Sequence, residues 1–233
     1  MLLFLIASAC AAPQWYGTPP VAAERIVSLA PSLTESLFAI GAGAKVVGVS
    51  RFDDRPAEVA ALPKLGAVGE LSVESVLALD PDLVVSVKAR SLVPAYQRLA
   101  QFGVAVVAYD GERIASFHNM LIHLGGLTGR ASAAQAISDE LRQALERPKK
   151  RPLAGLRVLV LVGRQPLFAA TDGSYMGEVV RALGGINVLS ERTKGFVPLG
   201  AESVLALEPA LIIDLSGDPS DMRMPPKARR LAS

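Results

Sequence analysis

The stretch "SVESVLALDPDLVV", residues 72–85, recurs near the end of the chain as "GAESVLALEPALII", residues 200–213. Eight of the fourteen positions are identical at a constant offset of 128 residues, where composition alone would give about one or two. In each copy a short helical pattern stops at a proline and an apolar run follows, which is typical of a helix followed by a buried strand. The chain is therefore predicted to contain two copies of one helix–loop–strand unit.

The segments that precede the two copies also repeat each other. Residues 25–29, "RIVSL", are predicted to form a buried strand, and "PSLTESLFAIGAG" after them has the pattern of a helix that stops at Gly41. Ser32 and Glu35 have the spacing of a capping box at the start of this helix. The same order returns as "RVLVLV" and then "SYMGEVVRALGG", which stops at Gly184. Apolar strands that alternate with helices predict an α/β fold with mostly parallel sheets flanked by helices.

A long helical stretch separates the two halves. Glycines at positions 125, 126 and 129 are expected to divide it into two helices, and the second, from Ala131 on, has apolar residues at helical spacing. We therefore expect two lobes joined by one long rigid helix, with a cleft at the carboxyl ends of the strands. The expected boundaries are residues 1–20 for an export leader, 21–115 for the N-terminal α/β lobe, 116–150 for the helical connector and 151–233 for the C-terminal α/β lobe.

The C-terminal lobe is expected to be incomplete. In the first half of the chain a helix and a fourth strand follow residues 82–87. In the second half the corresponding position, after Leu215, is followed by "GDPSDMRMPPKARRLAS" alone. Judged by its own internal repeat, the lobe is predicted to be truncated.

The N-terminal stretch "MLLFLIASACAAPQ" has the apolar run and small residues of an export signal. It is too short to span a bilayer. Its "ASAC" segment resembles a lipoprotein processing box, in which Cys10 would carry the lipid. The expected location is therefore the periplasm, with the protein either free or anchored to the membrane as a lipoprotein.

Composition and charge exclude several classes of protein. The chain is 51% apolar and 20% charged, which is typical of a globular protein. Its net charge is only +2, and the sequence has no basic stripe of the kind that binds nucleic acid. Its single cysteine cannot form a disulfide within the chain. Since His118 and His123 are the only histidines and stand five positions apart, a zinc or copper site built by the protein is not expected.

The usual motifs of enzymes are missing as well. We find no nucleophile elbow, no phosphate-binding loop and no zinc-protease helix motif in the sequence. Asp53 and Asp54 lie beside Arg51 and Arg55, which favours solvated ion pairs over a catalytic pair. The alternative to a protein without catalytic activity is a doubly wound α/β enzyme whose active site contains the Asp53 and Asp54 loop.

Two long segments carry a resemblance to a known family. "RIVSLAPSLTESLFAIGAGAKVVGVSRFDDRP" and "LPKLGAVGELSVESVLALDPDLVVS", together with the connector and the second copy of the repeat, are similar to vitamin B12-type substrate-binding proteins of bacterial ABC importers. The resemblance runs from about Arg25 to Asp218, and the family also includes haem and ferric-siderophore receptors. It implies a class III periplasmic-binding-protein fold with a cleft that buries a metal chelate.

The resemblance implies a receptor and not an enzyme. Its ligand would be a corrinoid such as cobalamin, with haem or a ferric siderophore as the alternative, and delivery would be to the permease dimer of an ABC importer. The ligand would bring its own cobalt or iron, so no cofactor is expected, and the receptor is expected to act as a monomer. The positive charge of Lys88 and Arg90 suits haem or an anionic siderophore at least as well as a corrinoid.

In this family the ligand is bound by loops at strand ends, and docking uses one glutamate per lobe. The matching ligand positions are Pro31, Ser32, Phe52, Arg55, Phe168 and Phe196. Phenylalanine rings suit the faces of a planar macrocycle, and the first helix N-terminus suits a polar edge. The docking positions are Glu74 and Glu202, which would meet arginines on the two permease subunits. A glutamate in a first helical turn can instead simply complement the helix dipole.

Overall fold

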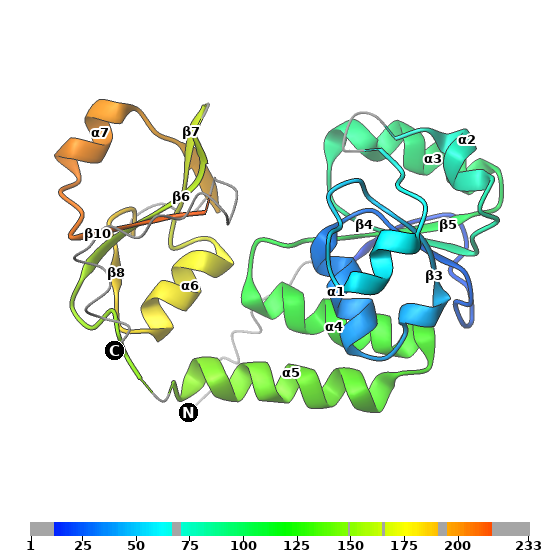
Figure 1. The fold of residues 1–233 in the computed structure, drawn as a ribbon, viewed down its shortest axis with the longest axis horizontal. Helices are drawn as coiled ribbons and strands as arrows, with labels where there is room; N and C mark the ends of the chain where they lie inside the picture. The colour runs from blue at the N-terminus through cyan, green and yellow to red at the C-terminus, as the bar shows by residue number, and fades with distance from the viewer. Residues whose placement is uncertain (1–11, 67–70, 149, 165, 191–194, 216–233) are drawn as a thin grey trace, which may run out of the picture. The chain divides into compact units, whose positions relative to one another are not determined.

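The computed structural model describes residues 12–66, 71–148, 150–164, 166–190 and 195–215 (Figure 1). The chain forms two compact units. Unit 1 comprises Met1–Gly111 and Ala115–Glu140, and unit 2 comprises Glu112–Ile114 and Leu141–Ser233. Cys10, most of the expected leader and residues 216–233, where the truncation was expected, lie outside the described residues.

Unit 1 is built on a five-stranded sheet. In spatial order its strands are β1 (Gln14–Tyr16), β5 (Ala105–Tyr109), β4 (Leu83–Val87), β2 (Ile26–Ser28) and β3 (Val46–Val49). All pairings are parallel except that of β1 with β5. The predicted strands and the mostly parallel sheet are confirmed here. Strand β1 was not predicted, because its residues fell within the expected leader.

Helices cover both faces of this sheet, as the apolar strands predicted. They are α1 (Pro31–Ala39), α2 (Val73–Leu77), α3 (Val93–Gln101), α4 (Ile114–Thr128) and α5 (Ala131–Glu146), with short 3₁₀ segments at Gly43–Lys45, Ala57–Ala61 and Arg90–Leu92. One core cluster joins Leu33 of α1 to Leu124 of α4 and Ala134 of α5. The other joins Val76 of α2 to Leu99 of α3. Alternate residues of β4 enter the two clusters, so the strand is buried on both sides.

The start of α1 differs from the predicted capping box. The N-cap residue is Ala30, no side chain caps the helix, and Pro31 occupies the first turn. Proline suits this position because its fixed φ matches the helix and its missing N–H would have had no partner there. Ser32 is therefore already inside the helix. The predicted stop is confirmed, since Gly41 has φ +77°, a conformation that glycine adopts without cost.

The long helical stretch is two helices that turn at Gly129, whose φ is +71°. The other two glycines, Gly125 and Gly126, remain inside α4. Gly125 allows α4 and α5 to approach closely, because a Cβ there would lie 2.4 Å from the Cβ of Ala134. α4 and the first part of α5 pack in the core of unit 1, and the division between the units falls after Glu140 within α5.

Unit 2 has a mixed sheet. Its strands run in the order β10 (Leu211–Asp214), β6 (Arg157–Arg164), β7 (Leu167–Ala170) and β9 (Phe196–Pro198), and β8 (Ile186–Asn187) also pairs with β6. β6 is parallel to β10 and β8, whereas β7 is antiparallel to both β6 and β9. The prediction of a mostly parallel sheet is corrected here, because the chain turns back after β6 as a hairpin before it enters the next helix.

Two helices complete the described part of unit 2, α6 (Tyr175–Ala182) and α7 (Ala201–Ala206). α6 packs on one face of the sheet through Val180 and α7 on the other through Val204. Both copies of the repeat adopt the predicted helix–strand order, α2 before β4 and α7 before β10. Among the helices of the described residues, none is long and apolar enough to cross a membrane.

Candidate functional site

In unit 1 the first candidate residues, Pro31 and Ser32, lie just after the junction between β2 and α1. Ser28 and Thr34 are buried, and the hydroxyl of Thr34 donates a hydrogen bond of 2.8 Å to that of Ser28. This bond ties the strand end to the first turn of the helix. Pro31 is half-buried in that turn and Ser32 is exposed. Ser32 therefore stays a candidate for contact with a ligand.

The second group of candidates lies in the loop after β3. The Phe52 side chain is 59% exposed, and the guanidinium of Arg51 lies 5.1 Å from its ring centre. Arg55 is exposed as well and borders a shallow groove beside α1. Because the Phe52 ring is exposed to solvent, contact with an apolar partner would bury it and would be favourable.

The two aspartates of this loop have different surroundings. Asp53 is buried and accepts a hydrogen bond from the Ser50 hydroxyl, and its backbone carbonyl accepts one of 2.6 Å from the Lys64 ammonium. Asp54 is exposed. Asp53 holds the loop together while Asp54 faces solvent, an arrangement unlike two carboxylates that act on one substrate. The geometry gives no support to the enzyme alternative.

The two phenylalanines of unit 2 lie on strands, which corrects their predicted placement in loops. Phe168 belongs to β7 and Phe196 to β9, and the register pairs Phe168 with Pro198 and Ala170 with Phe196. Cross-strand partners point to the same side of a sheet, as do residues two apart on one strand. Both rings therefore lie on the face that α6 covers, where Ala170 and Phe196 pack with Val180.

A third aromatic residue on this face was not predicted. Tyr175 is the first residue of α6, and its ring meets that of Phe196 edge-on with centres 6.4 Å apart. Its side chain is 39% exposed, and partial burial raises the pKa of its phenol. We call Phe168, Phe196 and Tyr175 the aromatic face of unit 2. The sequence signal for Tyr175 was its place directly after the helix cap Ser174.

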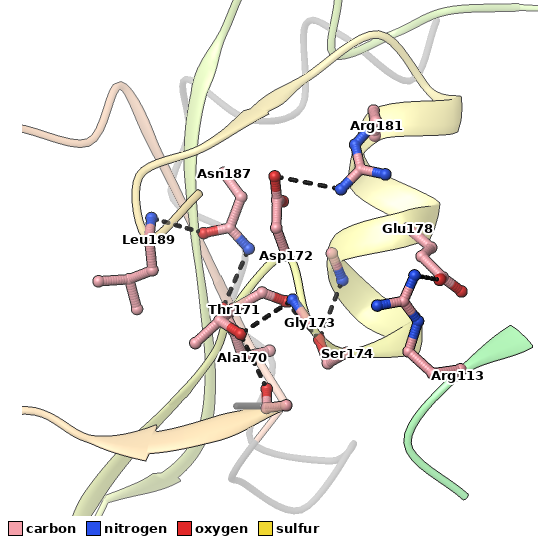
Figure 2. A network of polar contacts seen from close by, with 12 residues as sticks. Arg113, Ala170, Thr171, Asp172, Gly173, Ser174, Glu178, Arg181, Asn187 and Leu189 are labelled. Atoms are coloured by element: carbon pink, nitrogen blue, oxygen red, sulfur yellow. Dashed lines mark hydrogen bonds and ion pairs between the residues drawn. The ribbon is translucent and has the colours of Figure 1, made fainter. Parts of the chain in front are cut away.

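A buried polar network fixes the start of α6 (Figure 2). The Ser174 hydroxyl accepts a hydrogen bond of 3.1 Å from the N–H of Gly177 and donates one of 2.7 Å to the carbonyl of Thr171. The Thr171 hydroxyl accepts a hydrogen bond of 3.0 Å from the N–H of Gly173. Thr171 and Ser174 are fully buried. Satisfied buried networks are rigid, so Tyr175 is presented from a fixed position.

The two glutamates of the repeat occupy equivalent places. Glu74 and Glu202 both lie in the first turn of a short helix and are exposed. Glu74 accepts a hydrogen bond of 3.2 Å from Ser72, and Arg98 lies 3.4 Å away. A hydrogen bond from its own backbone, with smaller contributions from Ser72 and Arg98, lowers the pKa of Glu74. Each unit therefore carries one exposed glutamate at the same point of the fold.

Comparison with known proteins identifies the family of the chain. The sequence profile of the periplasmic binding protein family matches residues 26–225. A vitamin B12-binding protein from Pectobacterium atrosepticum is 29% identical over 197 residues, which cover 82% of this chain and 71% of that protein.

Among solved structures, a periplasmic haem-binding protein from Pseudomonas aeruginosa matches with a TM-score of 0.75 and 27% identity, covering 90% of this chain and 76% of the other. A periplasmic vitamin B12-binding protein from Vibrio cholerae matches with a TM-score of 0.71 and 25% identity, covering 84% and 77%. These matches confirm the resemblance and the fold expected from the sequence. The chain belongs to the periplasmic binding protein family, whose members are exported solute-binding proteins and not enzymes.

Proposed function

We propose that this protein captures a metal chelate in the periplasm and delivers it to an ABC importer. The observation that carries the proposal is the aromatic face of unit 2, on a chain that resembles vitamin B12- and haem-binding proteins. Phe168, Phe196 and Tyr175 come from two strands and a helix whose start is held by buried hydrogen bonds. Rigid rings of this kind suit the flat surface of a macrocycle, because little side-chain freedom is lost on binding.

The first candidate ligand is a corrinoid such as cobalamin. Unit 1 would contribute Pro31, Ser32, Phe52 and Arg55 as its own contacts. The ligand would carry its own cobalt, so the protein itself would need no cofactor. The second candidate is haem or a ferric siderophore, which the exposed cations Lys88 and Arg90 favour because such ligands are anionic.

A visible absorption titration distinguishes these candidates. Purified protein is mixed in turn with cobalamin, cobinamide, haemin and a ferric siderophore, and the shift of each chromophore is followed. We expect saturable, one-to-one binding of one chelate without turnover. Absence of binding to all four, or turnover of any of them, would contradict the proposal.

The aromatic face can be tested in the same titration. Phe168→Ala and Phe196→Ala are each expected to weaken chelate binding by about 1–3 kcal/mol, because each ring loses its contact with the ligand. Phe102→Ala is the matched control, since Phe102 is 60% exposed, lies just after α3 and is not one of the candidate residues. Unchanged affinity in both test variants, with folding intact, would remove the aromatic face from the site.

Docking to the importer is proposed to use Glu74 and Glu202. Two equivalent carboxylates, one in each unit, fit a permease dimer that offers two equivalent basic sites. The double variant Glu74→Arg with Glu202→Arg should keep its chelate affinity and lose docking and transport, while each single variant should be impaired in part. Raising the salt concentration should weaken docking of the wild type. Normal transport by the double variant would leave the glutamates as helix-dipole partners only.

Anchoring and oligomeric state complete the proposal. We propose that Cys10 carries a lipid and that the mature protein is a monomer. Cys10→Ala should then release the protein from membranes of the native host, as measured by fractionation and by mass spectrometry of the N-terminal peptide. Light scattering should give the mass of one chain. Equal membrane association of the variant, or the mass of a dimer, would contradict these two points.

A further inference from the structure

The crossover Glu112–Ile114 belongs to unit 2, although the chain on both sides of it belongs to unit 1. Three contacts hold it against α6, and Figure 2 shows one of them, the ion pair between Arg113 and Glu178. The N–H of Tyr175 donates a hydrogen bond of 2.6 Å to the carbonyl of Glu112. The N–H of Ile114 donates one of 2.8 Å to the Glu178 carboxylate, and the Arg113 guanidinium lies 2.5 Å from the other oxygen of that carboxylate. We call these five residues the Glu178 latch.

Glu178 caps the N-terminus of α4, although it lies far from this helix in the sequence. Ile114 is the first residue of α4, and the first N–H groups of a helix have no partner within it. A carboxylate at this end is favoured both as an acceptor and by the helix dipole. Caps normally come from the residue before the helix, whereas here the acceptor lies 64 residues further along the chain. Ile114 is thereby bound to α6 within unit 2.

Burial strengthens this contact. The Glu178 side chain is 16% exposed and both its oxygens have partners, whereas Arg113 is 51% exposed. Charged hydrogen bonds are stronger where water is excluded, and an exposed partner contributes less. The bond to the Ile114 backbone should therefore matter more than the ion pair.

The latch and the aromatic face share a residue. The backbone of Tyr175 bonds Glu112 while its ring meets Phe196. We propose that Glu178 is a positioning residue, which anchors the crossover to α6 and so holds Tyr175 and Phe196 in place for the ligand. Only the positioning of Tyr175 and Phe196 for a ligand rests on the proposed function. The anchoring of the crossover to α6 can be tested without any ligand.

Trypsin tests the anchor, since it cleaves after Arg113 only when the crossover detaches. Cleavage of the Arg113–Ile114 bond in the ligand-free full chain is followed by mass spectrometry. Glu178→Ala should speed this cleavage by about tenfold or more, because a charged acceptor is lost. Glu178→Gln retains an oxygen for Ile114 and should give an intermediate rate, and it serves if Glu178→Ala does not fold. Arg181→Ala is the matched control. It removes the partly exposed ion pair between Arg181, on the same helix, and Asp172, in the turn before that helix, and the rate should stay within about twofold. An unchanged rate in the Glu178 variants overturns the anchor.

Titration with cobalamin and haemin tests the positioning role. Glu178→Gln should weaken binding of whichever chelate the wild type accepts by about threefold to tenfold, mainly through faster dissociation, and Arg181→Ala should not. Faster cleavage with unchanged chelate affinity overturns the positioning role and leaves the anchor. If the wild type binds neither chelate, the proposed function fails and the cleavage result still decides the anchor.

Discussion

In unit 1 the guanidinium of Arg25, which precedes β2, donates hydrogen bonds of 2.6 and 2.8 Å to two backbone carbonyls that follow α2. In unit 2 the guanidinium of Arg157, at the start of β6, donates bonds of 2.7 and 3.4 Å to the two corresponding carbonyls after α7. The second residue of each pair, Asp80 or Glu208, has a positive φ of 48° or 44°. Residues other than glycine rarely adopt this backbone conformation. In each unit the hydrogen bonds from the arginine offset the strain of the turn that follows the short helix.

The two units differ at the other, C-terminal end of this strand. In unit 1, β2 leads at once into α1, and the third residue of the helix, Leu33, fills the core. In unit 2, β6 turns back as β7 before α6 begins, and the third residue of that helix is Gly177. A Cβ on Gly177 would lie 2.3 Å from the carbonyl oxygen of Thr171. The arginine contact is thus common to both units. The hairpin is present in unit 2 only; it supplies Phe168, and the turn that follows it requires a glycine at position 177.

The largest expected effect is at Leu33. Leu33→Ala should lower the free energy of unfolding by about 2–5 kcal/mol, because Leu33 is fully buried and the substitution leaves a cavity. Urea denaturation followed by circular dichroism measures the change. A loss below about 1 kcal/mol would mean that the core of unit 1 closes around the smaller residue.

Gly177→Ala should cost about 1–3 kcal/mol, although the same change normally stabilises a helix. The added methyl group meets backbone atoms of Thr171 and Asp172 that are held by the buried network. Gly126→Ala is the matched control, because a Cβ there meets nothing within 4 Å and the site is inside α4. The control should be neutral or stabilising. A stabilising Gly177→Ala would show that the turn between β7 and α6 yields easily.

The two arginines should have smaller and unequal effects. Arg25→Ala and Arg157→Ala should each lower the free energy of unfolding by about 1 kcal/mol, because the lost bonds are at the surface. Arg25 should cost more, since both its bonds are short. Lysine in place of either arginine should restore less than half, because it cannot donate to both carbonyls with a fixed fork. Equal losses, or full rescue by lysine, would contradict the comparison.

The smallest effect concerns pH and is confined to unit 1. His123 packs between Trp15 and Tyr109, and burial lowers its pKa. The unfolded chain takes up a proton near the usual pKa of about 6.5, so unfolding is favoured as the pH falls below that value. The melting temperature should fall by about 2 °C between pH 7.5 and 5.5 through this residue. His123→Gln should remove that part of the loss. An identical pH dependence in the variant would assign the loss to other groups.

Local patterns predicted much of the first unit because its elements follow one another directly. The stops at Gly41 and Gly184 were confirmed, since a positive φ after a helix is a local requirement. The capping box at Ser32 was wrong because Pro31 already satisfied the first turn. Strand β1 was missed because Trp15 and its neighbours are stabilised by β5 and by His123, which are distant in sequence.

The sequence by itself determined the duplication, the α/β order and the paired positions of Glu74 and Glu202, because these depend on periodicity and on residues close together in the chain. Only the tertiary structure decided the mixed sheet of unit 2, the shared face of Phe168, Phe196 and Tyr175, and the capping of α4 by Glu178. Each of these joins segments that lie far apart along the chain. Such contacts form only when strand pairing and helix packing bring the segments together, and a local pattern carries no record of the partner.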